Sequence, residues 1–253
     1  MPTFFLDALP SVPVFAALCF VAFLAGVMRG FSGFGGGLLI APAYSLFLSP
    51  TDVVVLVVVL NLLTTIQLMP DIVPSVKWPI VWRLFVPSLV GVPIGVAMLH
   101  TVDPMFMRKA IGLIVVSVAL LMLRGWNYKG RRGKVQDILV GTSCGYLTSI
   151  GGIGGPPIIL YLLSDKRLSA GDFRAICLML FFMIQLLALA QIGFSGSITS
   201  THGVYIAILL PVYIFAHWVG AVSYRYSING DQAQFKRISL WLLLLVGLTA
   251  VVL

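Results

Sequence analysis

Two glycine-dense stretches decide how this chain folds: Gly30-Phe-Ser-Gly-Phe-Gly-Gly-Gly37 and Gly151-Gly-Ile-Gly-Gly-Pro-Pro157. Each stretch interrupts apolar sequence and is followed by a further apolar stretch of helical length. Glycine is the poorest helix former apart from proline, so each stretch predicts a break in a helix. Matched helix breaks at membrane depth are typical of the substrate sites of transporters.

The composition makes the lipid bilayer the solvent for most of this chain. Of its 253 residues, 60% are hydrophobic and only 9% are charged, whereas soluble domains carry about 25% charged residues. Several apolar runs reach or approach the roughly 20 residues that a spanning helix requires. Strand-like alternation is absent, which disfavours a transmembrane barrel. We therefore predict an all-α polytopic membrane protein.

The charges and cysteines exclude several other classes of protein. The net charge of +8 does not indicate nucleic acid binding, because the basic residues lie in short loops between apolar runs, as cytoplasmic Lys and Arg do. Cys19, Cys144 and Cys177 lie in apolar segments without C-x-x-C spacing, so no disulfide, metal site or cofactor is predicted. All eight acids are aspartates at span ends or in loops, so no buried carboxylate relay is predicted.

The chain contains an internal repeat. Four glycines recur 119 positions later, which gives the pairs Gly26/Gly145, Gly33/Gly152, Gly35/Gly154 and Gly36/Gly155. Farther along, the shift grows to 125 and pairs Gly95 with Gly220. We therefore predict two homologous halves, 1–124 and 135–253, joined by a basic linker at 125–134.

Each half is expected to contain a pair of short helical segments and then three full spans. The short pairs are predicted at 13–48, with segments 13–29 and 37–48, and at 135–163, with segments 135–150 and 156–163. The full spans are predicted at 50–70, 79–100, 105–124, 170–194, 202–224 and 234–253.

The distribution of positive charge predicts how the short pairs are inserted. If each pair folds back as a re-entrant hairpin, nearly all loop Lys and Arg share one side, and only Arg108 and Lys109 face the other. If each pair crosses once, the same residues divide almost evenly, so the positive-inside rule favours hairpins. The halves then form inverted repeats in a bacterial inner membrane, with both termini periplasmic and the linker cytoplasmic. If each short pair instead crosses the membrane twice, the later spans keep the same orientation, so this arrangement remains an alternative.

The hairpin tips are predicted to bind a small anion. The second helix of each hairpin points its N-terminus at mid-membrane, where unpaired N–H groups and the helix dipole favour negative charge. In the second tip the expected donors are the N–H groups of Gly152, Ile153, Gly154 and Gly155. The candidate substrate-binding residues are Ser32, Gly33, Phe34, Gly35, Gly36, Gly37, Ser149, Gly151, Gly152, Ile153, Gly154 and Gly155.

Glycines at G-x-x-x-G spacing also allow helices to pack closely. Close packing is the favoured interpretation for Gly26, Gly91, Gly95 and Gly141. For the tip glycines, packing remains the alternative to a substrate site.

Polar residues elsewhere in the spans either line the pathway or join helices by hydrogen bonds. They are Asn61, Thr64, Thr65, Gln67, Gln185, Gln191 and His217. The repeat places Thr65 opposite Gln185, and this pair is the preferred support of the site. Arg29 either reaches the anion or extends to the interface.

Three further kinds of polar residue have expected roles. His217 is a candidate for proton linkage. Ser32, Thr148 and Ser149 flank the glycine turns and are candidate hydroxyl donors. Asp52 and Asp172 are expected to cap helices.

The chain resembles the sulfite exporter TauE/SafE family, also called the 4-toluene sulfonate uptake permease family. The residues that carry the resemblance are Gly30-Phe-Ser-Gly-Phe-Gly-Gly-Gly-Leu-Leu-Ile-Ala-Pro42 and Gly145-Tyr-Leu-Thr-Ser-Ile-Gly-Gly-Ile-Gly-Gly-Pro-Pro157. Length and the two-half organisation match over essentially the whole chain. One departure is Pro156 where the first copy has Gly37, so the two tips are not equivalent. The resemblance implies transport of sulfite, sulfoacetate or other sulfonates, often as export.

Other functions on the same scaffold remain as alternatives. Uptake instead of export, or transport of another small metabolite, would use the same architecture, with carbonyls at half-helix C-termini binding a neutral or cationic substrate. An enzyme is not predicted, because the chain has no H-E-x-x-H motif, no Ser/His/Asp set and no paired carboxylates. The broad Leu-rich outer faces favour a homodimer.

Overall fold

The computed structural model describes residues 11–124, 130, 133–162, 165, 167–226, 241, 244, 245, 247, 248 and 250. The described part is built of helices and contains no strand, which confirms the predicted all-α class. The elements are α2 (Val12–Ser32), α3 (Gly36–Tyr44), α4 (Pro50–Ile72), η1 (Val73–Ser75), α5 (Trp78–Thr101), α6 (Pro104–Leu123), α7 (Lys134–Gly151), α8 (Gly155–Leu162), α9 (Ala170–Phe194) and α10 (Ser200–Tyr226). The predicted linker 125–134, the predicted span 234–253 and both termini lie wholly or mostly outside the described residues.

Six described helices are long and apolar enough to cross a membrane: α2, α4 with η1, α5, α6, α9 and α10. The first of these, α2, is longer than the predicted segment 13–29. It has 21 residues, or about 32 Å of helix, because Gly26 and Gly30 pack against α10 within the helix instead of ending it. This length is enough to cross the hydrocarbon core. If α2 instead enters only part of the way, as in a re-entrant hairpin, it has to be tilted.

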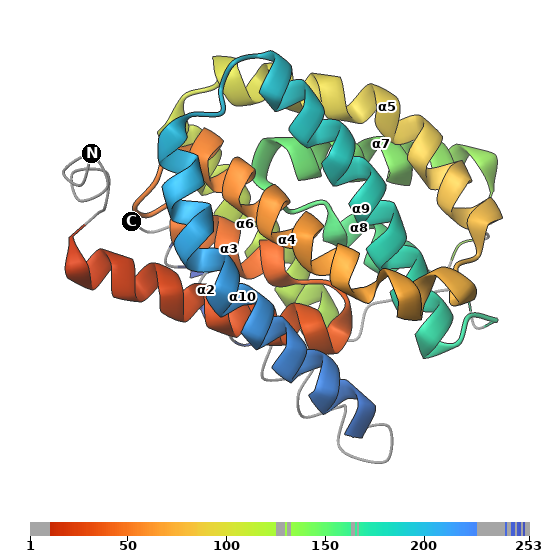
Figure 1. The fold of residues 1–253 in the computed structure, drawn as a ribbon. Helices are drawn as coiled ribbons and strands as arrows, with labels where there is room; N and C mark the ends of the chain where they lie inside the picture. The colour runs from red at the N-terminus through yellow and green to blue at the C-terminus, as the bar shows by residue number, and fades with distance from the viewer. Residues whose placement is uncertain are drawn as a thin grey trace.

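Two helices are too short to cross. Helix α3 has 9 residues and α8 has 8, so they extend only about 14 Å and 12 Å, against a hydrocarbon core of roughly 30 Å. Each follows one of the glycine stretches, so α2 with α3 and α7 with α8 form two broken helix pairs (Figure 1).

The same helix packing occurs twice. Helix α2 packs along α10, and α7 packs along α5. A methyl group placed on Gly95 would lie 2.6 Å from the carbonyl oxygen of Tyr146, and one on Gly220 would overlap the carbonyl oxygen of Val27. These contacts are equivalent, because Gly95 and Gly220 are 125 positions apart and Val27 and Tyr146 are 119 apart. The pairing of α2 with α10 and the pairing of α7 with α5 therefore use corresponding positions of the sequence repeat.

Helices α4 and α9 form the centre of the bundle. About two thirds of their most apolar windows are buried, 67% in α4 and 61% in α9, against 33–39% in the other four candidate spans. They contact each other, and the two broken pairs reach this centre from different sides (Figure 1). The breaks therefore lie against the most buried helices of the molecule.

Both central helices begin with a capping box. In α4 the hydroxyl of Ser49 accepts from the Asp52 N–H, and in α9 Ser169 and Asp172 make the same arrangement. The expectation that both aspartates cap helices is confirmed, with the serines at the N-cap and the carboxylates three residues later.

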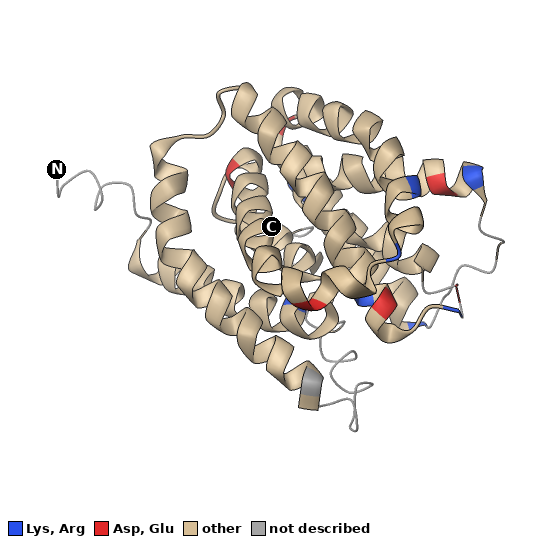
Figure 2. Cartoon of the chain, turned by 45° about the vertical axis from the view of Figure 1, so that its right-hand side comes forward, with Lys and Arg blue, Asp and Glu red and all other residues tan. Residues whose placement is uncertain are grey.

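Each capping aspartate also contacts a side chain of the other half of the chain, a lysine in one case and a histidine in the other. The Lys77 ammonium lies 3.6 Å from an Asp172 oxygen, and the His202 ring lies 2.9 Å from an Asp52 oxygen. The first contact requires the loops before α5 and α9 to share one side. A single crossing by each short pair would place these loops on opposite sides of a membrane, so the contact is consistent with short pairs that fold back. Most described Lys and Arg accordingly gather toward one side of the bundle (Figure 2).

We predict that Gly95→Ile destabilises the protein, because the added side chain has no room against the α7 backbone. Overpacking of this kind costs about 1–3 kcal/mol or more. Gly203→Ile is the matched control, since Gly203 is also helical and has no atom within 4 Å of the added carbon. Thermal unfolding in detergent measures the difference, and equal melting temperatures for the two variants would contradict the packing account.

Candidate functional site

The first break is made by two glycines with left-handed backbone. Helix α2 ends at Gly33, which has φ 79° and donates its N–H to the carbonyl of Arg29 at 2.7 Å. Gly35 then precedes α3 with φ 92°. Residues with a side chain rarely adopt these angles, so the chain turns here because both positions are glycine.

The second break ends α7 in the same way. Gly152 has φ 67° and donates to the carbonyl of Thr148 at 2.8 Å, while Ile153 donates to that of Leu147 at 3.1 Å. The bond from Gly152, which has a left-handed backbone, to the carbonyl four residues earlier is the αL motif that closes a helix C-terminus. Gly33 and Gly152 are 119 positions apart, so the two left-handed caps are equivalent positions of the repeat.

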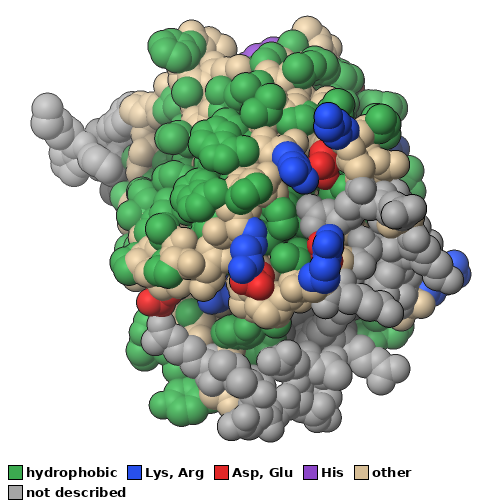
Figure 3. Space-filling model, turned by 90° about the vertical axis from the view of Figure 1, so that its right-hand side faces the viewer, with side chains coloured by type: hydrophobic (Ala, Val, Ile, Leu, Met, Phe, Trp, Pro, Cys, Tyr) green, Lys and Arg blue, Asp and Glu red, His purple; other side chains and the backbone are tan. Residues whose placement is uncertain are grey.

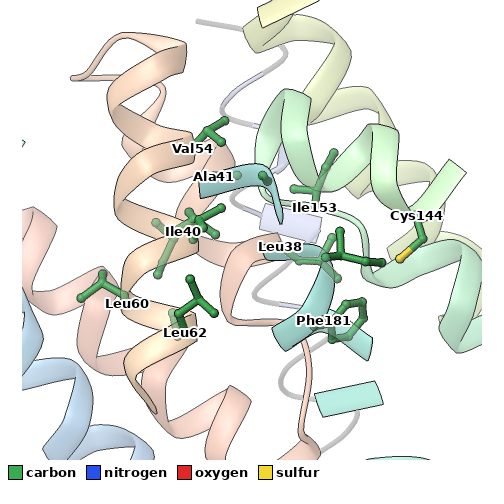
Figure 4. Packing of buried hydrophobic residues seen from close by; sticks show 14 of the residues in the cluster. Leu38, Ile40, Ala41, Val54, Leu60, Leu62, Cys144, Ile153 and Phe181 are labelled. Carbon is green, nitrogen blue, oxygen red and sulfur yellow. The ribbon is translucent and has the colours of Figure 1, made fainter. Parts of the chain in front are cut away.

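The two breaks contact each other. A side-chain carbon on Gly37, in the first turn of α3, would overlap the carbonyl oxygen of Gly152. A side-chain carbon on Gly155 would lie 3.9 Å from both Leu38 and Phe181, two of the apolar residues labelled in Figure 4. The absence of a side chain at Gly37 therefore lets the start of α3 approach the end of α7 to backbone contact.

A small cavity of about 20 Å³ lies where the breaks meet α4 and α9. A volume of this size holds about one water molecule. Its polar side chains are those of Arg29, Asn61, Thr148 and Gln185. The rest of its lining is Gly35, Gly37, Leu38, Gly152, Gly154, Gly155 and Phe181.

Arg29 brings an uncompensated positive charge to this cavity. The residue is only 2% exposed, and no acidic residue lines the cavity. One terminal nitrogen donates to the Thr65 hydroxyl at 2.8 Å and to the Asn61 carbonyl at 3.3 Å, while Nε has no hydrogen-bond partner. A buried charge held by neutral groups alone is costly, so the site favours a negatively charged ligand.

Arg29 is therefore enclosed by the protein and does not extend to its surface. Beside it, the Tyr213 hydroxyl donates to Asn61 Oδ1 at 2.7 Å, which leaves the two amide hydrogens of Asn61 as donors. The side-chain oxygen of Gln185, which is 3% exposed, has no hydrogen-bond partner. The lining thus places the donors of Arg29 and Asn61 beside an unpaired acceptor on Gln185.

The two helix starts differ in their capacity to donate. In α3 the first N–H groups, which have no partner within the helix, belong to Gly36, Gly37 and Leu38. In α8 the second and third residues are Pro156 and Pro157, which carry no N–H. Of the backbone donors expected in the second tip, only Gly154 and Gly155 remain, because Gly152 and Ile153 are engaged in the cap.

The expected hydroxyl donors are also engaged. Ser32 donates to backbone carbonyls of its own turn, Thr148 donates to the carbonyl of Cys144 at 2.7 Å, and Ser149 donates to that of Gly145 at 3.1 Å. Each hydroxyl has a single proton, so these groups offer only lone pairs to a ligand. Their role is to donate hydrogen bonds to carbonyl oxygens of α2 and α7 near the helix breaks.

The cavity brings together only some of the candidate residues. Gly35, Gly37, Gly152, Gly154, Gly155, Arg29 and Gln185 line it. Thr65 supports Arg29 from behind, and the position of Gly36 lies against Arg29 and Tyr213. The candidates that do not line it are Ser32, Gly33, Phe34, Ser149, Gly151, Ile153 and His217.

Several of these outlying candidates have other surroundings. Phe34 meets Phe173 edge to face, and Gly151 packs against Ile111. His217 is buried behind α2, with its backbone carbonyl against Gly30.

Leu38 and Phe181 are lining residues that the sequence reasoning missed. The repeat could have indicated Phe181, because a shift of 120 positions pairs it with Asn61, which was already a candidate. The same shift pairs Gln185 with Thr65, and a shift of 119 pairs Thr148 with Arg29. The charged group and its direct partners thus come from the first half, whereas the second half contributes neutral equivalents.

The helical bundle, with six candidate spans around a buried polar centre between broken helices, defines a multi-pass α-helical membrane protein. The chain belongs to the sulfite exporter TauE/SafE family, whose model matches residues 18–250. This match confirms the resemblance inferred from the glycine stretches and extends it over nearly the whole chain. Neither a curated protein nor a solved structure matches the chain.

We predict that Arg29→Gln abolishes stabilisation of the protein by sulfite without destabilising the fold. Losing a charged hydrogen bond costs about 1.5–3 kcal/mol, or about tenfold to a hundredfold in affinity. The melting temperature without ligand should stay equal or rise, because an uncompensated buried charge is removed. Thermal shift titrations with sulfite measure both effects, with Arg108→Gln as the control.

A purely structural Arg29 would give the opposite pattern. The ligand-free melting temperature of Arg29→Gln would then fall, and its sulfite-induced shift would match that of Arg108→Gln.

Proposed function

We propose that this protein is a secondary transporter that exports sulfite or a small sulfonate across the bacterial inner membrane. The observation that carries the proposal is the guanidinium of Arg29, which is buried at the junction of the two helix breaks with no acidic residue in the cavity lining. A sulfur oxyanion would supply the missing negative charge. The family to which the chain belongs supports the substrate class.

The anion is held from two sides. On the first side, Arg29 and the N–H groups at the start of α3 donate to its oxygens, and the positive end of the helix dipole adds attraction. On the other side, Gln185 and the N–H groups of Gly154 and Gly155 complete the coordination. Because α8 begins with two prolines, the interaction is stronger on the α3 side.

Binding requires the cavity to widen. Sulfite has four heavy atoms, whereas the cavity of about 20 Å³ holds about one water molecule. The start of α3 and the end of α7, which meet through Gly37 and Gly152, have to separate to admit the anion. The structure therefore corresponds to a closed conformation of the proposed transporter.

Alternating access follows from the repeated packing. The halves are proposed to be inverted repeats whose broken helix pairs move against α5 and α10, as in other transporters built from such repeats. The contacts Lys77–Asp172 and His202–Asp52 lie at equivalent positions of the repeat, since residues 202 and 77 are 125 apart and residues 172 and 52 are 120 apart. Each contact joins a central helix to the other half of the chain. We propose that each one holds one end of the transport pathway closed.

A second candidate is uptake of a small anion, or transport of another small metabolite, on the same scaffold. Arg29 favours an anion over a neutral or cationic substrate, because a buried guanidinium repels a cation and gains little from a neutral molecule. Export rather than uptake is favoured by the membrane potential. Each unit of negative charge that leaves a negative interior gains about 2.3 kcal/mol per 100 mV.

We predict that proteoliposomes containing the protein release sulfite faster when their interior is made negative. A potassium gradient with valinomycin sets the potential, and a sulfite-reactive dye outside records the release. Arg29→Gln should abolish the flux, and Arg108→Gln should preserve it. Equal flux through Arg29→Gln and the unaltered protein would refute the anion site. Flux that does not change with the membrane potential would refute export driven by that potential.

We also predict that fixing either end closed stops transport. One double variant carries Lys77→Cys with Asp172→Cys, and the other carries Asp52→Cys with His202→Cys. Treatment with a short bifunctional maleimide should abolish sulfite flux in both, because each end must open once per cycle. Single-cysteine variants treated in the same way control for modification, and full flux through a cross-linked protein would falsify the proposed closing contacts.

A further inference from the structure

A second, much larger hollow lies at the side of the bundle where the basic residues gather. Its volume is about 1040 Å³, and it is formed by the first turns of α5 and α7 and by the segment before α9. The surface view of this side shows basic and acidic side chains close to hydrophobic ones (Figure 3). It is separate from the cavity of Arg29, because the two linings share no residue.

The rim of the groove carries more basic than acidic side chains. Its basic residues are Lys77, Arg83, Lys134 and Arg167, and its acids are Asp137 and Asp165. Arg167 pairs with Asp165 at 3.0 Å, Lys77 pairs with Asp172, and Asp137 accepts the Tyr161 hydroxyl at 2.6 Å. Within the described part of the chain, Arg83 and Lys134 have no ion-pair partner.

The floor of the groove is hydrophobic and faces outward. Trp82 is 49% exposed, Val86 is 55% exposed and Ile138 is 54% exposed. Val86 and Ile138 lie one helical turn or so farther along α5 and α7 than Arg83 and Lys134. The groove therefore offers positive charge at its outer end and hydrocarbon contacts toward the membrane, with a tryptophan of the kind enriched at bilayer interfaces.

We propose that this groove binds one anionic phospholipid. Its phosphate lies between Arg83 and Lys134, and its acyl chains follow Trp82, Val86 and Ile138. A free phosphate ion would leave the hydrophobic floor without a partner, whereas a lipid matches both parts. Basic pockets between membrane helices commonly bind anionic headgroups in this way. The proposal is independent of what passes through the Arg29 cavity.

The test compares lipids on the purified, delipidated protein in detergent. Native mass spectrometry and thermal unfolding are measured with phosphatidylglycerol, phosphatidylcholine and inorganic phosphate. The site variant is Arg83→Gln with Lys134→Gln, and the matched control is Arg108→Gln with Lys109→Gln, which removes the same charge elsewhere. Lys77 is left unchanged because it pairs with Asp172.

The expected result is one retained phosphatidylglycerol and a rise in melting temperature with that lipid only. The site variant should bind it roughly thirtyfold more weakly, with an unaltered melting temperature in the absence of lipid, and the control variant should bind normally. Val86→Ser should also weaken binding, which separates lipid contact from charge alone. Equal binding of phosphatidylcholine, an equal effect of phosphate, or equal losses in both double variants would overturn the proposal.

Discussion

The backbone contact between Gly37 and Gly152 is the constraint on which the rest of the structure depends. It brings two helix breaks to one point beside the most buried helices, α4 and α9. Any side chain at Gly37 would overlap the opposing carbonyl and push α3 away from the end of α7. The small cavity, its polar lining and the position of Arg29 all follow from how closely the two breaks approach.

Glycines that recur at matching positions of the sequence make matching structures. Gly95 and Gly220 allow equivalent helix pairings, and Gly33 and Gly152 form equivalent left-handed caps. At the centre, however, Arg29 corresponds to Thr148, Asn61 to Phe181 and Thr65 to Gln185. Within the cavity lining, the first half therefore contributes the charged side chain of Arg29, and the second half contributes neutral residues.

The sequence predicted much of the fold because its signals are local. Glycine runs predict breaks, long apolar runs predict spans, and a serine followed three residues later by aspartate predicts a capped helix start. The end of α2 was harder to predict, because Gly26 and Gly30 weaken a helix in isolation and are kept helical only by packing against α10.

The site was predicted less completely, for two physical reasons. Hydrogen-bond partners depend on the folded geometry, which engages the hydroxyls of Ser32, Thr148 and Ser149 and the N–H groups of Gly152 and Ile153. The direction of a long side chain depends on its neighbours, and Thr65 is the partner that draws Arg29 inward. Leu38 and Phe181 enter the lining only because the two breaks meet beside them.

The most direct test of this account is to locate a bound anion by anomalous diffraction. Selenite has the shape and charge of sulfite, and its selenium scatters anomalously, so its position can be found without interpretation of weak density. The account predicts a single strong peak within hydrogen-bonding reach of Arg29 and the first turn of α3. A peak elsewhere in the molecule, with none beside Arg29, would contradict it.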